Sequence, residues 1–111
     1  MDGQAGNELR AAVVRLAWTS DAQIEYLHGI GVGGLADELA LEFDDLFAVH
    51  RTCPDSLGPA GCVLADLDRT LERMSGEVNA HLWTDQALRS ASEWHEVRAL
   101  AALALTLLPH A

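Results

Sequence analysis

Lysine is absent from this chain of 111 residues, and its seven basic residues, all arginine, face seventeen aspartates and glutamates. The formal net charge at pH 7 is −10. Binding nucleic acid through its phosphates requires clusters of Lys or Arg that displace counterions, and anionic membrane surfaces attract basic segments in the same way. The scarcity of positive charge therefore excludes both kinds of ligand and favours a basic protein as partner.

The chain also lacks a long hydrophobic run. Its longest uncharged stretch, residues 99–111, contains Pro109 and His110, and the apolar part is about half of the roughly 20 residues that a membrane span needs. The opening residues, MDGQAGN, have neither the basic nor the apolar region of a secretory signal. We therefore expect a cytoplasmic protein that does not associate with a membrane.

Cysteine is scarce, with only Cys53 and Cys62. A disulfide between them would close a short loop and add roughly 2–3 kcal/mol by constraining the unfolded chain, whereas free thiols are the commoner state in a reducing cytoplasm. Together with His50, the two cysteines offer three potential zinc ligands, although their spacing differs from that of paired CxxC knuckles. A small metal-binding or thiol-dependent protein built on these three residues is therefore one alternative interpretation.

Helical periodicity is what the sequence has in abundance, and no alternating β-branched segment stands out. Helices are predicted at about residues 8–18, 20–28, 35–50, 60–74 and 92–108, with a short turn at 85–88 and the main loop at 51–61. Ser20 with Gln23, and Ser90 to Glu93, have the spacing of capping boxes, and Thr84 is a further candidate N-cap. We expect an all-α fold, a compact bundle of four to five helices that forms one domain over residues 1–111.

The glycines after the second predicted helix have the spacing of a dinucleotide-binding motif. Gly29, Gly31 and Gly34 match GxGxxG, but that motif works where a β-strand leads into the turn, and here a helix precedes it. Asp37 and Glu38 follow in the first turn of the next helix, where they would repel a phosphate. We interpret the segment as an interhelical turn and expect no cofactor.

Catalytic and di-iron patterns are incomplete. Glu25 and His28 form one Glu-x-x-His element, but di-iron bundles need a second copy, which the chain lacks. No Gly-x-Ser-x-Gly elbow is present, and His95-Glu96 begins a metalloprotease-like pattern whose second histidine is replaced by Ala99. These gaps favour a non-catalytic protein, and we assign no catalytic residue.

The helix predicted over residues 35–50 has the cleanest amphipathic pattern. At about 100° per residue its apolar side chains fill one arc, and acids fill the opposite arc. We define the acidic face of this helix as Asp37, Glu38, Leu41, Glu42, Asp44 and Asp45. Acids around an exposed leucine suit docking on a basic partner, because the charged rim steers association while the apolar centre supplies affinity. Val49 lies at the edge of the same arc, and a solvated face with two stray apolar residues, Leu41 and Val49, is the alternative.

These patterns predict a non-catalytic interaction module that acts on a basic protein partner through the acidic face. Small immunity proteins, antitoxins and inhibitors have this size and charge, which is a likeness of class only. The last helix is apolar nearly all round, so a homodimer through Leu100 to Leu108 is a further alternative. Trp18 and Trp94 are expected in the core, and Trp83 is expected to be partly exposed.

Overall fold

The computed structural model describes the backbone of residues 2–31 and 36–108, and their side chains except those of residues 2–7, 54 and 56. These residues form six α-helices and three short 3-10 helices and contain no strand, which confirms the all-α helical bundle. The α-helices are α1 (Asp2–Ala17), α2 (Ser20–Gly29), α3 (Asp37–Phe47), α4 (Ala60–Arg73), α5 (Asp85–Ser90) and α6 (Ser92–Leu107). The 3-10 helices are η1 (Ala48–His50), η2 (Pro54–Leu57) and η3 (Glu77–Leu82).

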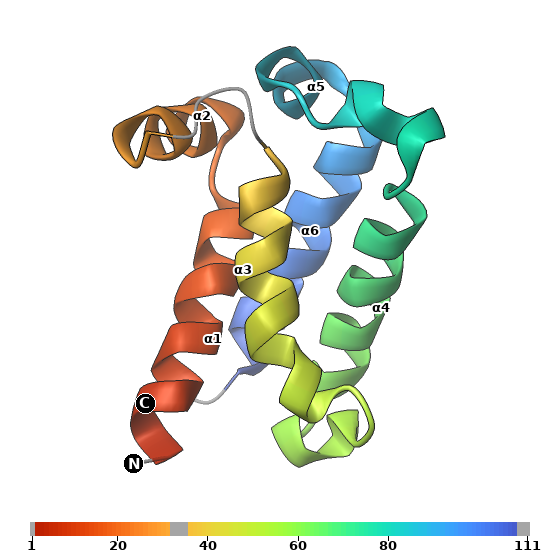
Figure 1. The fold of residues 1–111 in the computed structure, drawn as a ribbon. Helices are drawn as coiled ribbons and strands as arrows, with labels where there is room; N and C mark the ends of the chain where they lie inside the picture. Colours follow the sequence, from red (N-terminus) through yellow and green to blue (C-terminus); the bar gives the residue numbers. More distant parts are fainter. Residues whose placement is uncertain (1, 32–35, 109–111) are drawn as a thin grey trace.

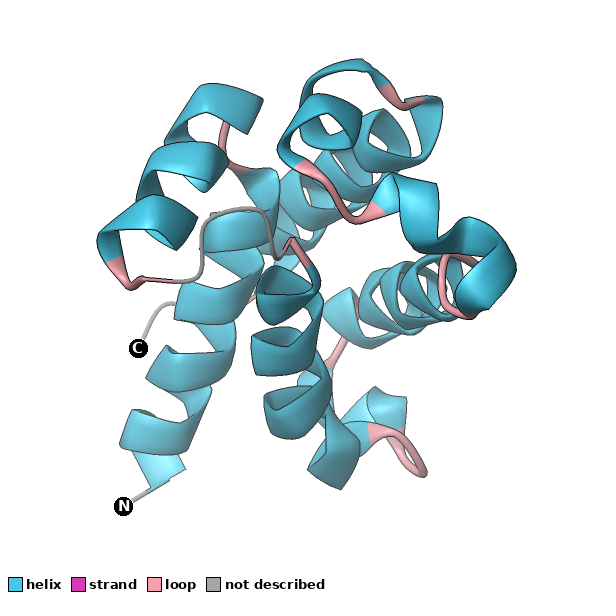
Figure 2. Ribbon diagram, turned by 45° about the horizontal axis from the view of Figure 1, so that its top comes forward, coloured by secondary structure: helices cyan, strands magenta, loops and turns pink. Residues whose placement is uncertain are grey.

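Helix α6 lies at the centre of the bundle. It packs most extensively against α4 and α1, while α3 packs chiefly against α1 and the shorter α2 and α5 lie against each other at one end (Figure 1). Figure 2 shows the same arrangement from another side, with α3 near the middle and α4 seen obliquely to its right. Because α3 packs chiefly on α1 and α4 packs on α6, α3 and α4 do not pack closely against each other.

Aromatic side chains anchor the core. Phe43 and Phe47 of α3 stack with their ring centroids 5.2 Å apart. The indole of Trp94 is buried and donates to the carbonyl of Leu82 at 2.6 Å, while Trp83 packs edge-on against it. Trp83 is half-buried, as predicted, whereas Trp18 is also half-buried and packs edge-on against Tyr26 instead of lying in the core.

The helix N-caps differ from the sequence prediction at two of three sites. Thr84 caps α5 as expected, since its hydroxyl accepts from the amide of Ala87 at 3.1 Å. At α2 the cap is Thr19, one residue before Ser20, and it accepts from the amide of Ala22. At α6 the capping box predicted from Ser90 to Glu93 does not form, because Ser90 belongs to α5 and the N-cap, Ala91, has no side-chain acceptor.

Several helix boundaries also differ. Helix α1 begins at Asp2, ahead of the predicted Glu8, because the helical backbone extends towards the N-terminus from the first residue of the apolar pattern. Helix α3 ends as an α-helix at Phe47 and continues as η1, and its predicted start at Leu35 lies outside the described residues. Helix α2 ends at Gly29, and Gly31 has a φ of 84°, which suits the glycine turn predicted there. Gly34, the last residue of the GxGxxG match, also lies outside the described residues.

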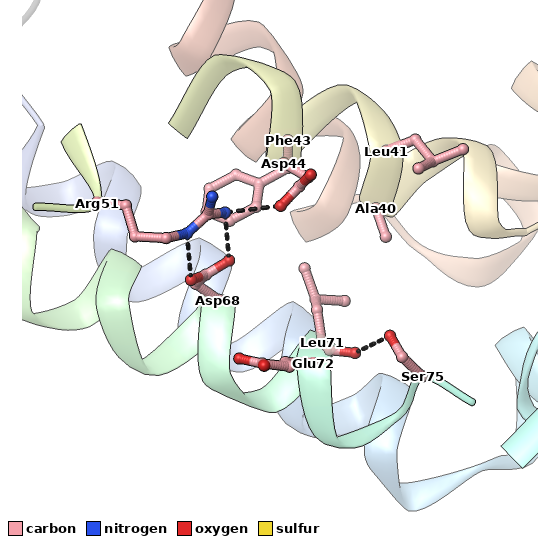
Figure 3. Close-up of a pocket in the computed structure, with 9 residues that line it drawn as sticks. All are labelled: Ala40, Leu41, Phe43, Asp44, Arg51, Asp68, Leu71, Glu72 and Ser75. Atoms are coloured by element: carbon pink, nitrogen blue, oxygen red, sulfur yellow. Dashed lines mark hydrogen bonds and ion pairs between the residues drawn. The ribbon is translucent and has the colours of Figure 1, made fainter. Parts of the chain in front are cut away.

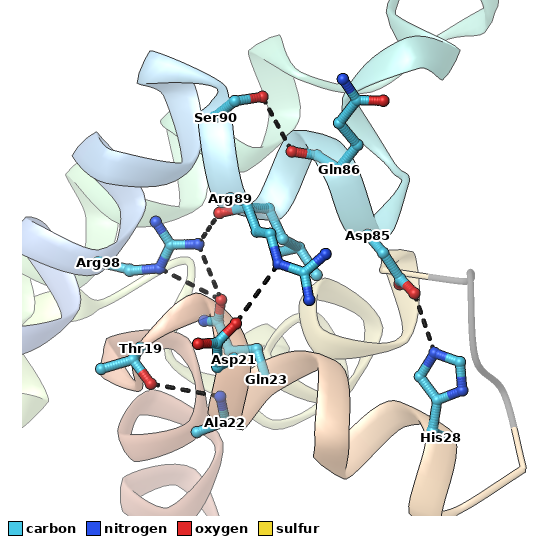
Figure 4. A network of polar contacts seen from close by, with 11 residues as sticks. Thr19, Asp21, Ala22, Gln23, His28, Asp85, Gln86, Arg89, Ser90 and Arg98 are labelled. Carbon is cyan, nitrogen blue, oxygen red and sulfur yellow. Dashed lines mark hydrogen bonds and ion pairs between the residues drawn. The ribbon is translucent and has the colours of Figure 1, made fainter.

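A polar network around Gln23 joins four helices (Figure 4). Gln23 is fully buried, and its side-chain amide donates to the carbonyls of Arg15 and Leu16, at 3.0 and 3.1 Å, in the last turn of α1. Its side-chain oxygen accepts from the guanidinium of Arg98 on α6, which also donates to the carbonyl of Leu88 on α5. Burial lowers the pKa of Arg98. A single buried amide thus satisfies helix-end carbonyls and positions a half-buried arginine.

We predict that Gln23→Met lowers the free energy of unfolding by about 2 kcal/mol, because the substitution keeps the side-chain volume but removes every bond of the amide. The matched control is Gln86→Met at an exposed position of α5, for which we expect a change within about 0.5 kcal/mol. Urea unfolding followed by circular dichroism measures both. Equal stability of the two variants would show that the network contributes nothing.

Candidate functional site

The acidic face of α3 points partly to solvent. Asp37, Asp45 and Leu41 are exposed and Glu38 is half-buried, with 49% of the surface of Leu41 accessible. Val49, at the edge of the same arc in η1, is 78% exposed. The structure therefore brings the predicted residues together on one surface, with an apolar side chain among the carboxylates.

One edge of the acidic face is bound to α1 and α2. Glu42 is half-buried and accepts a hydrogen bond of 2.6 Å from the hydroxyl of Tyr26. Its other carboxylate oxygen lies 3.5 Å from the guanidinium of Arg15, which also stands over the Tyr26 ring at 5.2 Å from the centroid. Glu42 is therefore held by contacts within the chain and is the acid of this face least available to a partner.

This hydrogen bond affects the chemistry of the only tyrosine in the chain. The bond to Glu42 raises the pKa of Tyr26 above its ordinary value of 10.0, with further contributions from burial and from the negative charge of Glu42. The phenol resists ionisation because a phenolate would lose its bond to the carboxylate and repel it.

The other edge is bound to α4 through Arg51 (Figure 3). The Arg51 guanidinium donates to Asp44 of α3 at 2.6 Å and to both carboxylate oxygens of Asp68 of α4, at 2.9 and 3.0 Å. It also stands over the ring of Phe47 at 5.7 Å from the centroid. The bonds to Asp68 and Asp44 raise the pKa of Arg51. Arg51 is thus a cation held between two helices by two carboxylates.

Three acids of the acidic face differ from Glu42 and Asp44 in their contacts. Within residues 2–31 and 36–108, no ion pair involves Asp37, Glu38 or Asp45. The sequence showed the acids but not their partners: Tyr26, Arg15, Arg51 and Asp68 carried no signal, because each contact depends on how distant segments meet. The uncompensated negative charge of this surface is therefore confined to fewer residues than the sequence pattern indicated.

The thiol and metal candidates lie in and beside the loop. Cys53 and Cys62 are exposed free thiols, so the disulfide that the sequence left open is not formed. His50 is half-buried at the end of η1. In the part of the chain that the structure describes, no three His, Cys, Asp or Glu side chains are grouped so that they could hold a metal ion. This arrangement gives no support to the zinc alternative.

The last helix is largely covered. Trp94, Val97, Ala101 and Ala104 are buried, and Leu100, Leu105 and Leu107 are half-buried against the core. Leu103 is the large apolar residue of α6 that remains exposed. The apolar character of the helix is thus explained mainly by packing within the chain.

Comparison with known proteins adds no family and no related fold: no protein family model, curated protein or solved structure matches this chain. Among the described helices, none is long and apolar enough to cross a membrane. Any proposed function therefore depends on the residues themselves.

We predict that the ionisation of Tyr26, followed by tyrosinate absorbance, has its midpoint above pH 10, and that Glu42→Gln lowers this midpoint. The substitution leaves a neutral hydrogen-bond acceptor and removes the charge that opposes the phenolate. Asp45→Asn, which neutralises an acid of the same helix with no bond to Tyr26, should leave the midpoint unchanged.

The same shift predicts a fall in stability at alkaline pH. The folded chain holds the Tyr26 proton more tightly than the unfolded chain, so this contribution is present below pH 10 and is lost as pH rises through the folded-state pKa. If the midpoint of Tyr26 ionisation is the same in the parent protein and in Glu42→Gln, the hydrogen bond between Tyr26 and Glu42 is refuted.

Proposed function

We propose that this protein is a non-catalytic interaction module that binds a basic protein partner through the acidic face of α3. The observation that carries the proposal is the exposure of Leu41 among Asp37, Glu38 and Asp45, three acids without an ion pair in the described structure. Carboxylates at the rim of an interface raise the rate of encounter with a basic surface, and a central apolar side chain supplies affinity once water is expelled.

The fixed edges of the face support this function. Glu42 is held by Tyr26 and Arg15, and Asp44 is held by Arg51, so α3 is braced on both sides. A surface that is already ordered loses little conformational entropy on binding, which favours affinity. The acidic face should therefore lose less conformational entropy on binding than an acidic helix without these contacts would lose.

The size and charge of the module fit proteins that neutralise or regulate a basic target, as immunity proteins, antitoxins and small inhibitors do. This remains a likeness of class. The two free thiols are consistent with action in a reducing compartment, and we propose the cytoplasm.

We predict that reversing the charge of Asp37, Glu38 and Asp45 to Lys abolishes the capture of a basic protein from extracts of the source cells. The matched control reverses Glu8, Glu25 and Asp55, three exposed acids on other segments, and changes the net charge equally. The control variant should capture the same protein as the parent. Equal loss in both variants would assign the capture to overall charge, and no loss in either would refute the proposed surface.

The homodimer alternative rests on Leu103, the exposed large apolar residue of α6. A single leucine provides little area compared with the roughly 800 Å² per partner of a stable interface. We therefore expect a monomer of 11.9 kDa in light scattering, and a dimer that Leu103→Glu dissociates would establish the alternative.

A further inference from the structure

A groove runs between α3 on one side and, on the other, α4 and the segment that follows it up to Trp83. It consists of two adjoining hollows of about 410 and 390 Å³, which share Ala40, Leu41 and Ser75 in their linings. Phe43 and Leu71 line the first hollow, and Ala80 and Trp83 line the second. We call this feature the acidic groove, because Asp37, Asp44, Asp68 and Glu72 also line it.

The lining combines an apolar floor with charged walls. Phe43 and Leu71 belong to the buried core, and Trp83 is half-buried beside it. Figure 3 shows Leu71 pointing up from α4 towards α3, with Glu72 next to it on α4 and Ser75 just beyond the end of that helix. A site of this kind recognises a ligand that is apolar on one side and charged on its flanks.

The negative charge of the groove indicates that the flanks of the ligand carry positive charge. The four carboxylates are opposed by Arg51 alone among the basic side chains that line the two hollows. Asp44 and Asp68 already hold Arg51, while Asp37 and Glu72 have no ion pair among the described residues. Arg51 shows that a guanidinium fits between the two walls, and the remaining acids are placed to receive further cations from outside the chain.

The shape specifies the form of the ligand. Two adjoining hollows between α3 and the segment formed by α4 and η3 can receive the apolar side chains of an amphipathic helix, spaced at i, i+3, i+4 and i+7. A strand would need a sheet edge to extend, and the described residues contain no strand. Nucleic acid is disfavoured because its phosphates would face the carboxylates.

We infer that the acidic groove binds a basic amphipathic helix of the partner, with its apolar face in the two hollows and its Lys or Arg side chains on Asp37 and Glu72. This inference rests on the proposed function and adds the form of the partner and the second wall of the site. Helix α4 thereby becomes part of an interface that the sequence assigned to the acidic helix alone.

The test uses synthetic helical peptides and the full-length protein. The probe is an 18-residue peptide of about equal Leu and Lys content, ordered so that leucines fall on one helical face. One control peptide has the same composition without an apolar face, and another replaces every Lys with Glu. Fluorescence anisotropy of labelled peptide at low salt should show at least about tenfold tighter binding of the probe than of either control.

Two variants locate the binding. Ser75→Trp fills the point where the two hollows join, and Glu72→Lys reverses an acid on the α4 wall, so each should weaken binding of the probe by about tenfold. Glu25→Lys changes the net charge as Glu72→Lys does, at an exposed site on α2 outside the groove, and should leave affinity within about twofold. Circular dichroism confirms that each variant is folded, and Glu72→Lys remains informative if Ser75→Trp is not.

The outcomes separate this inference from the proposed function. If reversal of Asp37, Glu38 and Asp45 abolishes partner capture but Ser75→Trp and Glu72→Lys bind the probe normally, the α3 surface stands and the groove is wrong. Equal affinity for the two Leu/Lys peptides, or no binding of the probe, likewise overturns the groove. If the α3 reversal also has no effect on capture, the proposed function fails with it.

Discussion

The central position of α6 is the constraint on which the other helices depend. Its buried residues, Trp94, Val97, Ala101 and Ala104, must be covered from several directions, and α1 and α4 provide most of this cover. Helix α3 covers α1, so it does not close against α4. The groove between α3 and α4 thus follows from the way the core is filled, and the side chains that face it are free to carry charge.

The use of arginine within the chain concentrates the remaining negative charge. Among the described residues, Arg15, Arg51, Arg69, Arg73 and Arg89 each pair with an acid of this chain, and Arg98 is committed to Gln23 and the carbonyl of Leu88. Exposed pairs of this kind add little stability, typically below about 1 kcal/mol each. Their consequence is electrostatic: acids without such a pair, including Asp37, Asp45 and Glu72, set the field that a basic partner meets.

The sequence predicts the long helices because their apolar residues recur at helical spacing, and it predicts the acidic face for the same reason. It does not predict the caps reliably, since Thr19 and Ser20 have equivalent hydroxyls and backbone geometry chooses between them. The spacing of Ser20 and Gln23 indicates a capping box, but the bonds of Gln23 depend on how α2 packs against α1 and against α6, which is far away in the chain. The sequence does not predict the groove for a similar reason, because Asp68 and Glu72 face α3 only after η1 and η2 have turned the chain.

The most direct test of the acidic groove as the binding site is a map of amide chemical shifts in the ¹⁵N-labelled protein during titration with the Leu/Lys amphipathic peptide. We predict that the largest changes fall on both walls, at residues such as Asp37, Leu41, Glu72 and Ser75, and at the indole of Trp83. Changes confined to α3, spread over all acidic segments, or centred on α2 and η2 would contradict this account.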